Sequence, residues 1–362
     1  MSFIPSSRQT ILTGDRTTGP LHIGHYAGSL RNRLALQYDH DQFLLLANCQ
    51  AITDNASELG KSKGFGGGGP KVSAGSSEAF RAGKGPNHVI EVALDYLAAG
   101  IDPAVTTICV QSELPALAEL SLLYLNFVSV ARLERNPTVK EEIKLRGFMR
   151  DVPAGFLCYP AAQAADITAF RATLVPVGAD QAPMIELSNE IVRRINRQVQ
   201  KDILPEAKIL TPPVGRLPAP NGKGKMSKSL GTVIPLSASD DQISDVVMSM
   251  YTDPDHIRTS DPGRVEGNVV FTYLDAFDDR AEEVRNLKMR YQRGGVGDVP
   301  LKRRLISVLQ GILAPIRERR FEFSKRPDYV MDILATGAKK GRAITDETKR
   351  CIEDHLGIFR FH

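Results

Sequence analysis

The feature that most constrains this chain is a short β-type run that leads into a Gly-rich turn and then into a helical pattern. Gln9–Thr13 predicts a strand, Gly14–His25 contains the turn, and Tyr26–Leu34 predicts a helix. The exposed N–H groups and the dipole at such a helix start favour an anion. His22 and His25 lie three residues apart, so both can donate hydrogen bonds to phosphate oxygens from one side of the helix. Alone, the pattern is more often a tight turn with two surface histidines.

The rest of the first 235 residues alternates strand and helix patterns. Gln42–Ala47 is a continuous apolar run, typical of a strand that is buried on both faces of a parallel sheet. Strands are also predicted at Thr106–Ser112 and Leu174–Gln181, and helices at Val89–Gly100, Leu114–Leu133, Ala161–Phe170 and Met184–Gln200. Later in the chain only helices are predicted, at Ser239–Met250, Arg280–Arg290, Leu301–Phe323 and Asp328–Ala335. We therefore expect an α/β fold, with a Rossmann-type parallel sheet in residues 1–235 and an all-α domain in residues 236–362.

Two stretches of the first domain depart from this alternation. Residues 57–88 are rich in Gly, Lys and Ser and show no periodicity, so they cannot bury enough apolar surface to offset the entropy of ordering. We expect them to form a disordered insertion without a catalytic role. Residues 114–150 are expected to form a helical insertion. Its Leu-rich start fits either a subunit contact or an internal core helix, and the sequence does not separate the two.

Composition and charge set the broad class. The chain has 362 residues, of which 42% are hydrophobic and 24% charged, as in ordinary globular proteins. Its net charge of +4 is too small to indicate a nucleic-acid partner by itself. Basic runs do gather near the end, at Lys302–Arg304, Arg317–Arg320 and Lys339–Lys340, and they predict a phosphate-facing surface, although solvated helix faces look the same. The four cysteines show neither metal nor disulfide spacing. With no signal peptide or membrane-spanning run in the sequence, we expect a cytoplasmic protein.

The second motif is Lys225-Met226-Ser227-Lys228-Ser229, in a stretch rich in Gly and Lys that follows several prolines. Alone, this motif is typical of a solvated basic loop. It changes meaning when it is taken with His22-Ile23-Gly24-His25 far upstream. The two motifs, unsubstituted and in this order, resemble the HIGH and KMSKS signatures of the class I aminoacyl-tRNA synthetases.

Two further segments resemble the tyrosyl/tryptophanyl subgroup of that class, and in detail its bacterial tryptophanyl members. They are Tyr159–Ile167 and Val175–Gln181, with support from Gly100–Pro103 before the third strand. The resemblance implies an enzyme that activates L-tryptophan with ATP and Mg²⁺ and transfers it to tRNA(Trp). It also implies a homodimer that is supported by the insertion 114–150, and an anticodon-binding role for the C-terminal helical domain.

The resemblance further assigns roles to single residues. The catalytic contacts to phosphate are expected from His22, His25, Lys225 and Lys228. ATP binding is expected from Arg16, Thr17, Thr18, Gly24, His25, Gly178, Ala179, Asp180, Leu217, Lys225, Met226, Ser227, Lys228 and Ser229. Tryptophan binding is expected from Tyr159, Gln163, Asp166, Ile167, Val175, Val177 and Gln181, and no protein metal site is expected.

Asp166 has the strongest physical case among these residues. It lies beside the small or apolar residues Ala164, Ala165 and Ile167. A carboxylate that is buried there needs a hydrogen-bond donor, and an indole N–H supplies one. We therefore expect Asp166 to select the amino acid. Without the flanking motif, a solvent-facing helical aspartate would be the better interpretation.

Gln163 keeps alternatives open. The commonest tryptophanyl enzymes carry Met at this position, whereas tyrosyl enzymes place Gln in a similar pattern. Arg16 likewise replaces a Gln that is usual in the turn. A tyrosyl-tRNA synthetase is therefore one alternative. A non-catalytic paralogue that acts as a binding protein is another, although the intact HIGH and KMSKS residues argue against it. A nucleotidyltransferase of the HIGH type is usually shorter and lacks the helical tail.

Overall fold

The computed structural model describes residues 8–55, 88–148, 151–211, 217–222, 224 and 233–361. The lysine motif Lys225–Ser229 lies outside these residues, as does the predicted insertion 57–88 except for His88. The roles expected of Lys225, Met226, Ser227, Lys228 and Ser229 therefore stay predictions.

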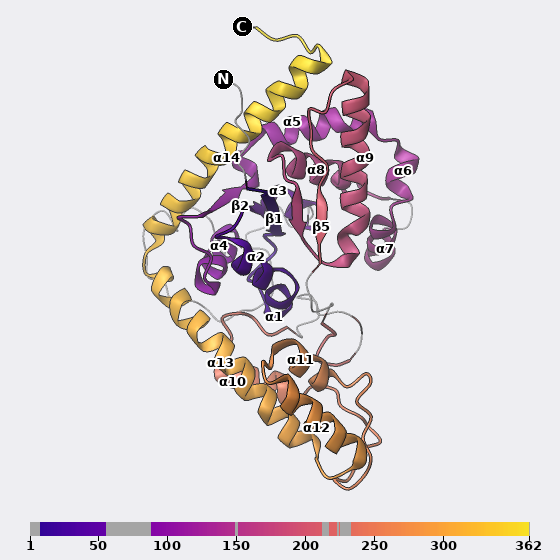
Figure 1. The fold of residues 1–362 in the computed structure, drawn as a ribbon, viewed down its shortest axis with the longest axis vertical. Helices are drawn as coiled ribbons and strands as arrows, with labels where there is room; N and C mark the ends of the chain where they lie inside the picture. Colours follow the sequence, from indigo (N-terminus) through magenta and orange to yellow (C-terminus); the bar gives the residue numbers. More distant parts are fainter. Residues whose placement is uncertain are drawn as a thin grey trace.

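The centre of the molecule is a five-stranded parallel sheet with the strand order β3-β2-β1-β4-β5 (Figure 1). Its strands are β1 (Thr10–Arg16), β2 (Asp41–Ala47), β3 (Thr106–Val110), β4 (Leu174–Pro176) and β5 (Lys208–Leu210). The strand order reverses between β1 and β4. In open α/β sheets ligands bind outside the carboxyl ends of the strands at such a reversal. The predicted Rossmann-type sheet is confirmed, and the sheet places the candidate site at the ends of β1 and β4.

Strand β2 shows why this sheet is covered on both faces. Leu44 and Leu46 belong to one hydrophobic core, whereas Phe43 and Leu45 belong to a second core on the opposite face. Successive side chains of a strand point to opposite faces, so a continuous apolar run needs an apolar layer on each side. The helices that form those layers are α4 on one side and α5, α8 and α9 on the other.

The helices follow the predicted order, with differences at several boundaries. Those of the sheet-containing part are α1 (Ile23–His25), α2 (Arg31–Leu36), α3 (Asn48–Asn55), α4 (His88–Ala99), α5 (Pro115–Tyr124), α6 (Val130–Glu134), α7 (Pro137–Arg146), α8 (Ala154–Ala169) and α9 (Ala182–Val199). The helix predicted at Tyr26–Leu34 is a π-helix (Tyr26–Leu30) that continues into α2. The single helix predicted at Leu114–Leu133 is α5, a 3₁₀ turn (Leu125–Phe127) and then α6.

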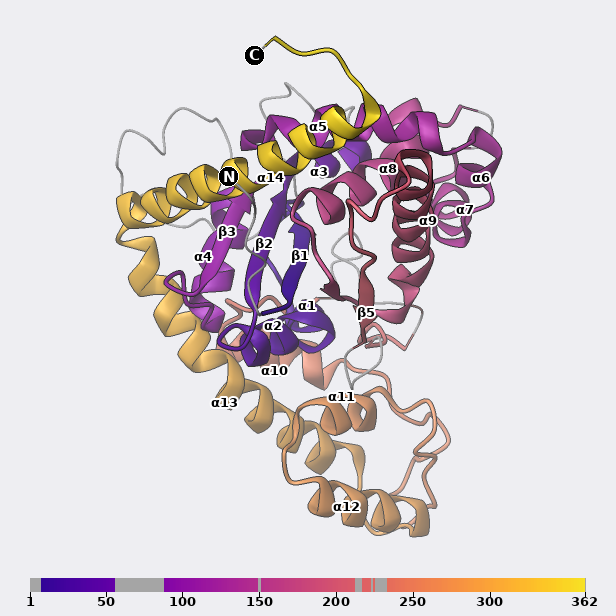
Figure 2. The same ribbon diagram turned by 45° about the horizontal axis from the view of Figure 1, so that its top comes forward.

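The C-terminal region is helical, as predicted. It contains α10 (Asp240–Met248), α11 (Val269–Phe277), α12 (Ala281–Arg293), α13 (Asp298–Ser324) and α14 (Pro327–Leu356). Figure 2 shows α11 and α12 toward one end of the molecule, while α13 leads back to the sheet. The hydrophobic core beneath α4 continues into α10, α11 and α13. The domain boundary after residue 235 stays a prediction.

Helix α14 is much longer than the predicted Asp328–Ala335 and returns along the edge strand β3. Gly337 and Gly341 lie where α14 touches the strand. A Cβ on Gly337 would collide with the carbonyl oxygen of Ile108, and a Cβ on Gly341 would lie 2.7 Å from Cys109 Sγ. The two glycines therefore let α14 cover an exposed sheet edge at close range.

Candidate active site

After strand β1, the segment Leu21–His25 lies at the carboxyl edge of the sheet and is here called the histidine turn. His22 is the N-cap of α1, and its Nδ1 accepts a hydrogen bond from the N–H of Gly24 at 3.1 Å. His25 Nδ1 accepts a hydrogen bond from the N–H of His22 at 3.2 Å, and the two ring centroids are 3.9 Å apart. The sequence correctly placed the two imidazoles side by side at the helix start.

These hydrogen bonds also fix the tautomers of the two rings. A ring nitrogen that accepts a backbone N–H carries no proton, so the neutral imidazole must hold its proton on Nε2. Both histidines therefore have Nε2–H as their donor. This is the atom that a phosphate oxygen needs, because the Nδ1 atoms are already used to shape the turn.

A buried ion pair supports the turn from behind. Arg33 donates to Asp15 Oδ2 at 2.7 Å, and the Tyr96 hydroxyl donates to the same oxygen at 2.7 Å. Arg33 also donates to Ser29 Oγ at 2.9 Å, inside the π-helix that follows the histidines. Burial alone would raise the pKa of Asp15, but Arg33 and then His25 hold that pKa well below its usual range. Asp15 is therefore a fixed anion whose charge is neutralised by Arg33.

A second chain of contacts joins the β1 turn to α7 and α8. Tyr159 on α8 donates from its hydroxyl to Glu142 Oε2 at 3.3 Å. Glu142 on α7 lies 3.8 Å from an Arg16 guanidinium nitrogen. Arg16, predicted to bind ATP, and Tyr159, predicted to bind the amino acid, thus meet on one carboxylate. The sequence reasoning missed Glu142, because nothing in α7 marks it apart from other surface acids.

Asp166 is the buried carboxylate on the other side of the site. It is only 5% exposed, and Gln111 Nε2 donates to its two oxygens at 3.0 and 2.9 Å. Within the described residues, the structure gives Asp166 no cationic partner. Burial raises the pKa of Asp166 to about 7, although the Gln111 hydrogen bond lowers it. The carboxylate is held in place but its charge is not compensated.

The sequence reasoning did not include Gln111 in the site. It lies directly after β3, at the same sheet edge as the predicted ligand-binding residues. Its Oε1 accepts the N–H of Gln50 at 3.0 Å, which fixes the amide so that Nε2 faces Asp166. A polar residue that follows a buried strand was the signal that could have found it.

The turn after β4 lies at the same edge of the sheet. Val175 is buried in the core beneath α8 and Val177 is partly buried beside it. A Cβ on Gly178 would lie 2.6 Å from Asp180 Oδ1, so Gly178 leaves room for that carboxylate. Thr138 on α7 donates to the Asp180 carbonyl at 3.1 Å, and Gln181 Nε2 donates to Asp180 Oδ2 at 3.3 Å. The predicted nucleotide turn is thereby tied to the helix that carries Glu142.

The remaining predicted residues lie around the same edge. Thr17, Leu217 and Ile167 are buried. Thr18, Gly24 and Gln163 are half-buried. Ala179 is in the 3₁₀ turn Ala179–Gln181 that opens α9. Among the described residues, no group of three or more His, Cys, Asp or Glu side chains could hold a metal ion.

Comparison with known proteins decides the family. Residues 6–63 and 82–314 match the model of the tRNA synthetases class I (W and Y). The chain is 50% identical over 360 residues to the tryptophan--tRNA ligase of Clostridium longisporum, covering 98% of this chain and 99% of the relative. It is also 50% identical over 362 residues to the tryptophan--tRNA ligase of Lactococcus lactis subsp. lactis, with the same coverage. The chain belongs to the tryptophan--tRNA ligase family.

A solved structure of this family agrees with the fold. The tryptophanyl-tRNA synthetase from Campylobacter jejuni, complexed with ADP and tryptophan, has a TM-score of 0.74 and 27% identity. The match covers 96% of this chain and 100% of the Campylobacter chain. A tyrosyl-tRNA synthetase from Archaeoglobus fulgidus matches with a TM-score of 0.63 at 17% identity, which shows the shared fold alone. In the part of the chain that the structure describes, no helix is long and apolar enough to cross a membrane.

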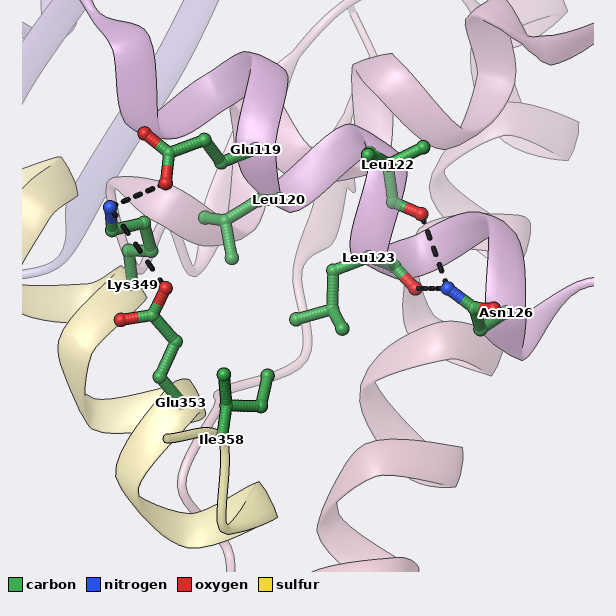
Figure 3. A pocket seen from close by; sticks show the side chains of 8 residues that line it. All are labelled: Glu119, Leu120, Leu122, Leu123, Asn126, Lys349, Glu353 and Ile358. Carbon is green, nitrogen blue, oxygen red and sulfur yellow. Dashed lines mark hydrogen bonds and ion pairs between the residues drawn. The ribbon is translucent and has the colours of Figure 1, made fainter. Parts of the chain in front are cut away.

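Figure 3 shows a surface hollow that is lined by other residues than these. It has a volume of about 260 Å³ and lies between α5 and the end of α14. Lys349 lies among its acidic residues, 2.5 Å from Glu119 and 3.9 Å from Glu353. None of the predicted site residues lines it, so the candidate site is identified from its chemistry and not from this hollow.

Proposed function

We propose that this chain activates L-tryptophan with ATP and then transfers the tryptophanyl group to tRNA(Trp). The observation that carries the amino-acid assignment is the buried Asp166 carboxylate, oriented by Gln111 and without a cation among the described residues. A buried charge of this kind is costly unless a donor satisfies it. An indole N–H is such a donor, and a ligand that lacks a matching donor would leave the charge unpaired.

The other side of the crevice fits a triphosphate. The Nε2–H groups of His22 and His25 point their donors away from the Nδ1 atoms that shape the turn. Together with Arg16, Thr17, Thr18, Gly24 and Leu217, they are proposed to hold ATP, with Gly178–Asp180 at the ribose. Lys225, Met226, Ser227, Lys228 and Ser229 are proposed to complete the phosphate contacts, and Lys225 and Lys228 to act as point charges.

The ammonium group of tryptophan would bind between the two sides. Tyr159 and Gln181 are proposed to accept its hydrogen bonds, and Glu142, in contact with both Tyr159 and Arg16, supplies a negative charge. Val175, Val177 and Ile167 would border the indole, with Gln163 beside Asp166 on α8. This arrangement directs the carboxylate of tryptophan toward the nucleotide.

The first reaction needs no protein base. A carboxylate oxygen of tryptophan attacks the α-phosphorus of ATP, the bond from that phosphorus to the β-phosphate oxygen breaks, and pyrophosphate leaves with the electron pair. The chain contributes position and charge: the imidazole donors and the two lysines stabilise the charge that builds on the phosphates. In the second reaction, the ribose hydroxyl at the tRNA end attacks the acyl carbon and AMP leaves.

Further expectations concern partners and location. Mg²⁺ is proposed to arrive with ATP and to be held mainly by phosphates and water. We propose a homodimer supported by residues 114–150, and an anticodon-binding role for residues 236–362. A tRNA-charging enzyme of this kind would act in the cytoplasm.

Amino-acid-dependent ATP–pyrophosphate exchange tests the proposal. L-Tryptophan should support exchange and L-tyrosine should be far weaker. Exchange with tyrosine alone would make the chain a tyrosyl enzyme, in line with the Gln163 departure. A folded protein that binds tRNA but exchanges with neither amino acid would be a non-catalytic paralogue.

A further inference from the structure

Three arginines in one turn of α13 lie against the elements that support the histidine turn. In the sequence, the run Arg317–Arg320 fitted either a phosphate-facing surface or a solvated helix face. In the structure the guanidinium groups of Arg317, Arg319 and Arg320 instead make internal hydrogen bonds. The partners of each arginine show what this turn of α13, here called the arginine turn, holds in place.

Arg320 acts on the histidine turn through Asp95. Its Nε donates to Asp95 Oδ1 at 2.7 Å, and a second nitrogen donates to Glu91. The other oxygen of Asp95 accepts the backbone N–H of Leu21 at 2.6 Å. Leu21 directly precedes His22. Asp95 is fully buried, so this carboxylate is a rigid bridge from α13 to the first residue of the turn.

Arg317 acts on the same turn from its other side. It donates to the Ala238 carbonyl at 2.6 Å and to Asp240 at 3.0 Å. The residues just before Ala238 pair with the histidine turn: the N–H of Ile23 donates to the Ile234 carbonyl at 2.9 Å, and the N–H of Leu236 donates to the Leu21 carbonyl at 3.0 Å.

The two sets of contacts share one residue. Leu21 uses its N–H on Asp95 and its carbonyl on Leu236, so its peptide groups are fixed on both sides. An arginine of α13 binds each of these two supports. Arg320 binds Asp95, and Arg317 binds Ala238, which lies two residues after Leu236. Arg319 donates to the Ala98 carbonyl at 2.6 Å and fastens the same helix turn to α4, which carries Asp95.

We propose that the arginine turn is a positioning element that sets where His22 and His25 stand for adenylate formation. This inference rests on the proposed function. A displacement of about 1 Å in a positioned group can lower a rate by roughly a hundredfold. The C-terminal helical region therefore supplies part of the precision of the active site, although none of its three arginines touches a reacting atom.

Charge explains why arginines are needed here. Burial raises the pKa of Asp95 to about 6, even though Arg320 and the Leu21 N–H lower it, and Glu91 adds to the rise. Without Arg320, the carboxylate would have to take up a proton or move toward water. Either change weakens the charged hydrogen bond to Leu21 and releases the start of the histidine turn.

The chain offers a matched control for the test. Arg304 lies in the same helix and makes the same kind of double contact, to buried Asp278 at 2.6 Å and to Glu283 at 2.8 Å. Those partners lie in the helical region and do not touch the histidine turn. Arg320→Met and Arg304→Met thus remove equivalent ion pairs, only one of which leads to Leu21.

The experiment measures tryptophan-dependent ATP–pyrophosphate exchange well below the melting temperature of each variant. Arg320→Met should lower the turnover number by about tenfold to a hundredfold, whereas Arg304→Met should stay within about twofold of the wild type. Arg320→Lys, which keeps the charge, should recover part of the rate. Equal rates for Arg320→Met and Arg304→Met would overturn the inference.

Hydrogen–deuterium exchange gives a readout that does not depend on activity. Peptides that contain Leu21–Tyr26 should lose protection in Arg320→Met and keep it in Arg304→Met. If the wild type shows no tryptophan-dependent exchange of pyrophosphate, the proposed function fails while this measurement still tests the positioning. If Arg320→Met does not fold, Arg317→Met takes its place, and unchanged protection in that variant would contradict the inference.

Discussion

Asp15 and Asp166 are two largely buried aspartates of the candidate site, and their pKa values are shifted in opposite directions. Asp15 receives a guanidinium and a phenol, so its pKa is held well below the usual range. Asp166 receives one amide, and its pKa is raised to about 7. Burial acts on both in the same direction, so the partner decides the outcome.

The difference separates a structural support from the group that we propose to bind the ligand. The charge of Asp15 is satisfied within the protein, and the pair holds the strand end and the π-helix around the histidines. Asp166 has no cationic partner among the described residues, so a hydrogen-bond donor on a ligand would stabilise its charge. A buried carboxylate without a cation lowers the stability of the ligand-free protein. Binding sites often lower stability in this way, because their groups are arranged for the ligand and not for folding.

The largest effect should come from breaking the satisfied pair. Arg33→Met leaves Asp15 without its cation, so the free energy of unfolding should fall by about 3–5 kcal/mol. Urea unfolding at pH 7.5 measures this loss. Arg193→Met, which removes a half-exposed pair with Glu206, is the control and should cost less than about 1 kcal/mol. A similar loss for both variants would show that burial of the Arg33 pair does not matter.

The next effect concerns the unsatisfied charge. Asp166→Asn keeps the shape of the side chain but replaces a charged acceptor with a neutral one, which is worth roughly 1.5–3 kcal/mol. Affinity for tryptophan should fall by about tenfold to a hundredfold, while affinity for ATP alone should hardly change. The chain has no Trp of its own, so indole fluorescence reports the ligand directly. An unchanged tryptophan titration would place the indole elsewhere.

The stability of the Asp166→Asn variant should also depend less on pH than that of the wild type. The folded pKa of Asp166 lies above its unfolded value, so the folded state binds more protons and stability falls as pH rises from about 4 to 7. Asp166→Asn removes this loss and should be at least as stable as the wild type at pH 8. A variant that is clearly less stable there would show that Asp166 is a support like Asp15.

A smaller effect is expected from pH on ligand binding. If ionised Asp166 is the better acceptor, affinity for tryptophan should rise by up to about tenfold between pH 6 and pH 8. Isothermal titration across this range measures the rise, and Asp166→Asn should show a flat profile. A rise of equal size in the variant would assign the titration to another group.

The sequence predicted those parts of the fold that depend on local pattern. Gln42–Ala47 was identifiable as a buried strand because an apolar run needs no knowledge of its neighbours, and β2 is Asp41–Ala47. Asp166 was singled out because its flanking motif resembles the family and its neighbours are small or apolar. The structure buries it, and its role in selecting the amino acid stays a prediction. The His22 and His25 pair followed from spacing alone, and its capping hydrogen bonds agree.

A local pattern cannot identify contacts between residues that are far apart in the sequence. Arg320 and Asp95 are 225 positions apart, so Arg317–Arg320 looked like a surface run. Helix α14 was predicted too short because glycine weakens a helix, whereas Gly337 is needed for close contact with β3. Gln111 and Glu142 matter through partners that the fold brings to them. The position of Gln111 directly after a buried strand was its one local signal, and no local pattern marks Glu142.

The smallest effect should come from replacing the whole satisfied cluster with apolar groups. In the variant that combines Asp15→Leu, Arg33→Met and Tyr96→Phe, no charge is left unpaired and the Tyr96 hydroxyl is removed with its partner. Buried ion pairs are often replaceable by apolar side chains of similar volume, so stability should return to within about 1 kcal/mol of the wild type. Urea unfolding beside Arg33→Met makes the comparison direct. If the combined variant were as unstable as the single one, the cluster would hold the fold by its hydrogen bonds rather than by balancing the charge of Asp15. Recovery would show that the Asp15 charge is dispensable for folding, whereas the Asp166 charge, for which no apolar replacement can bind an indole N–H, is kept for the ligand.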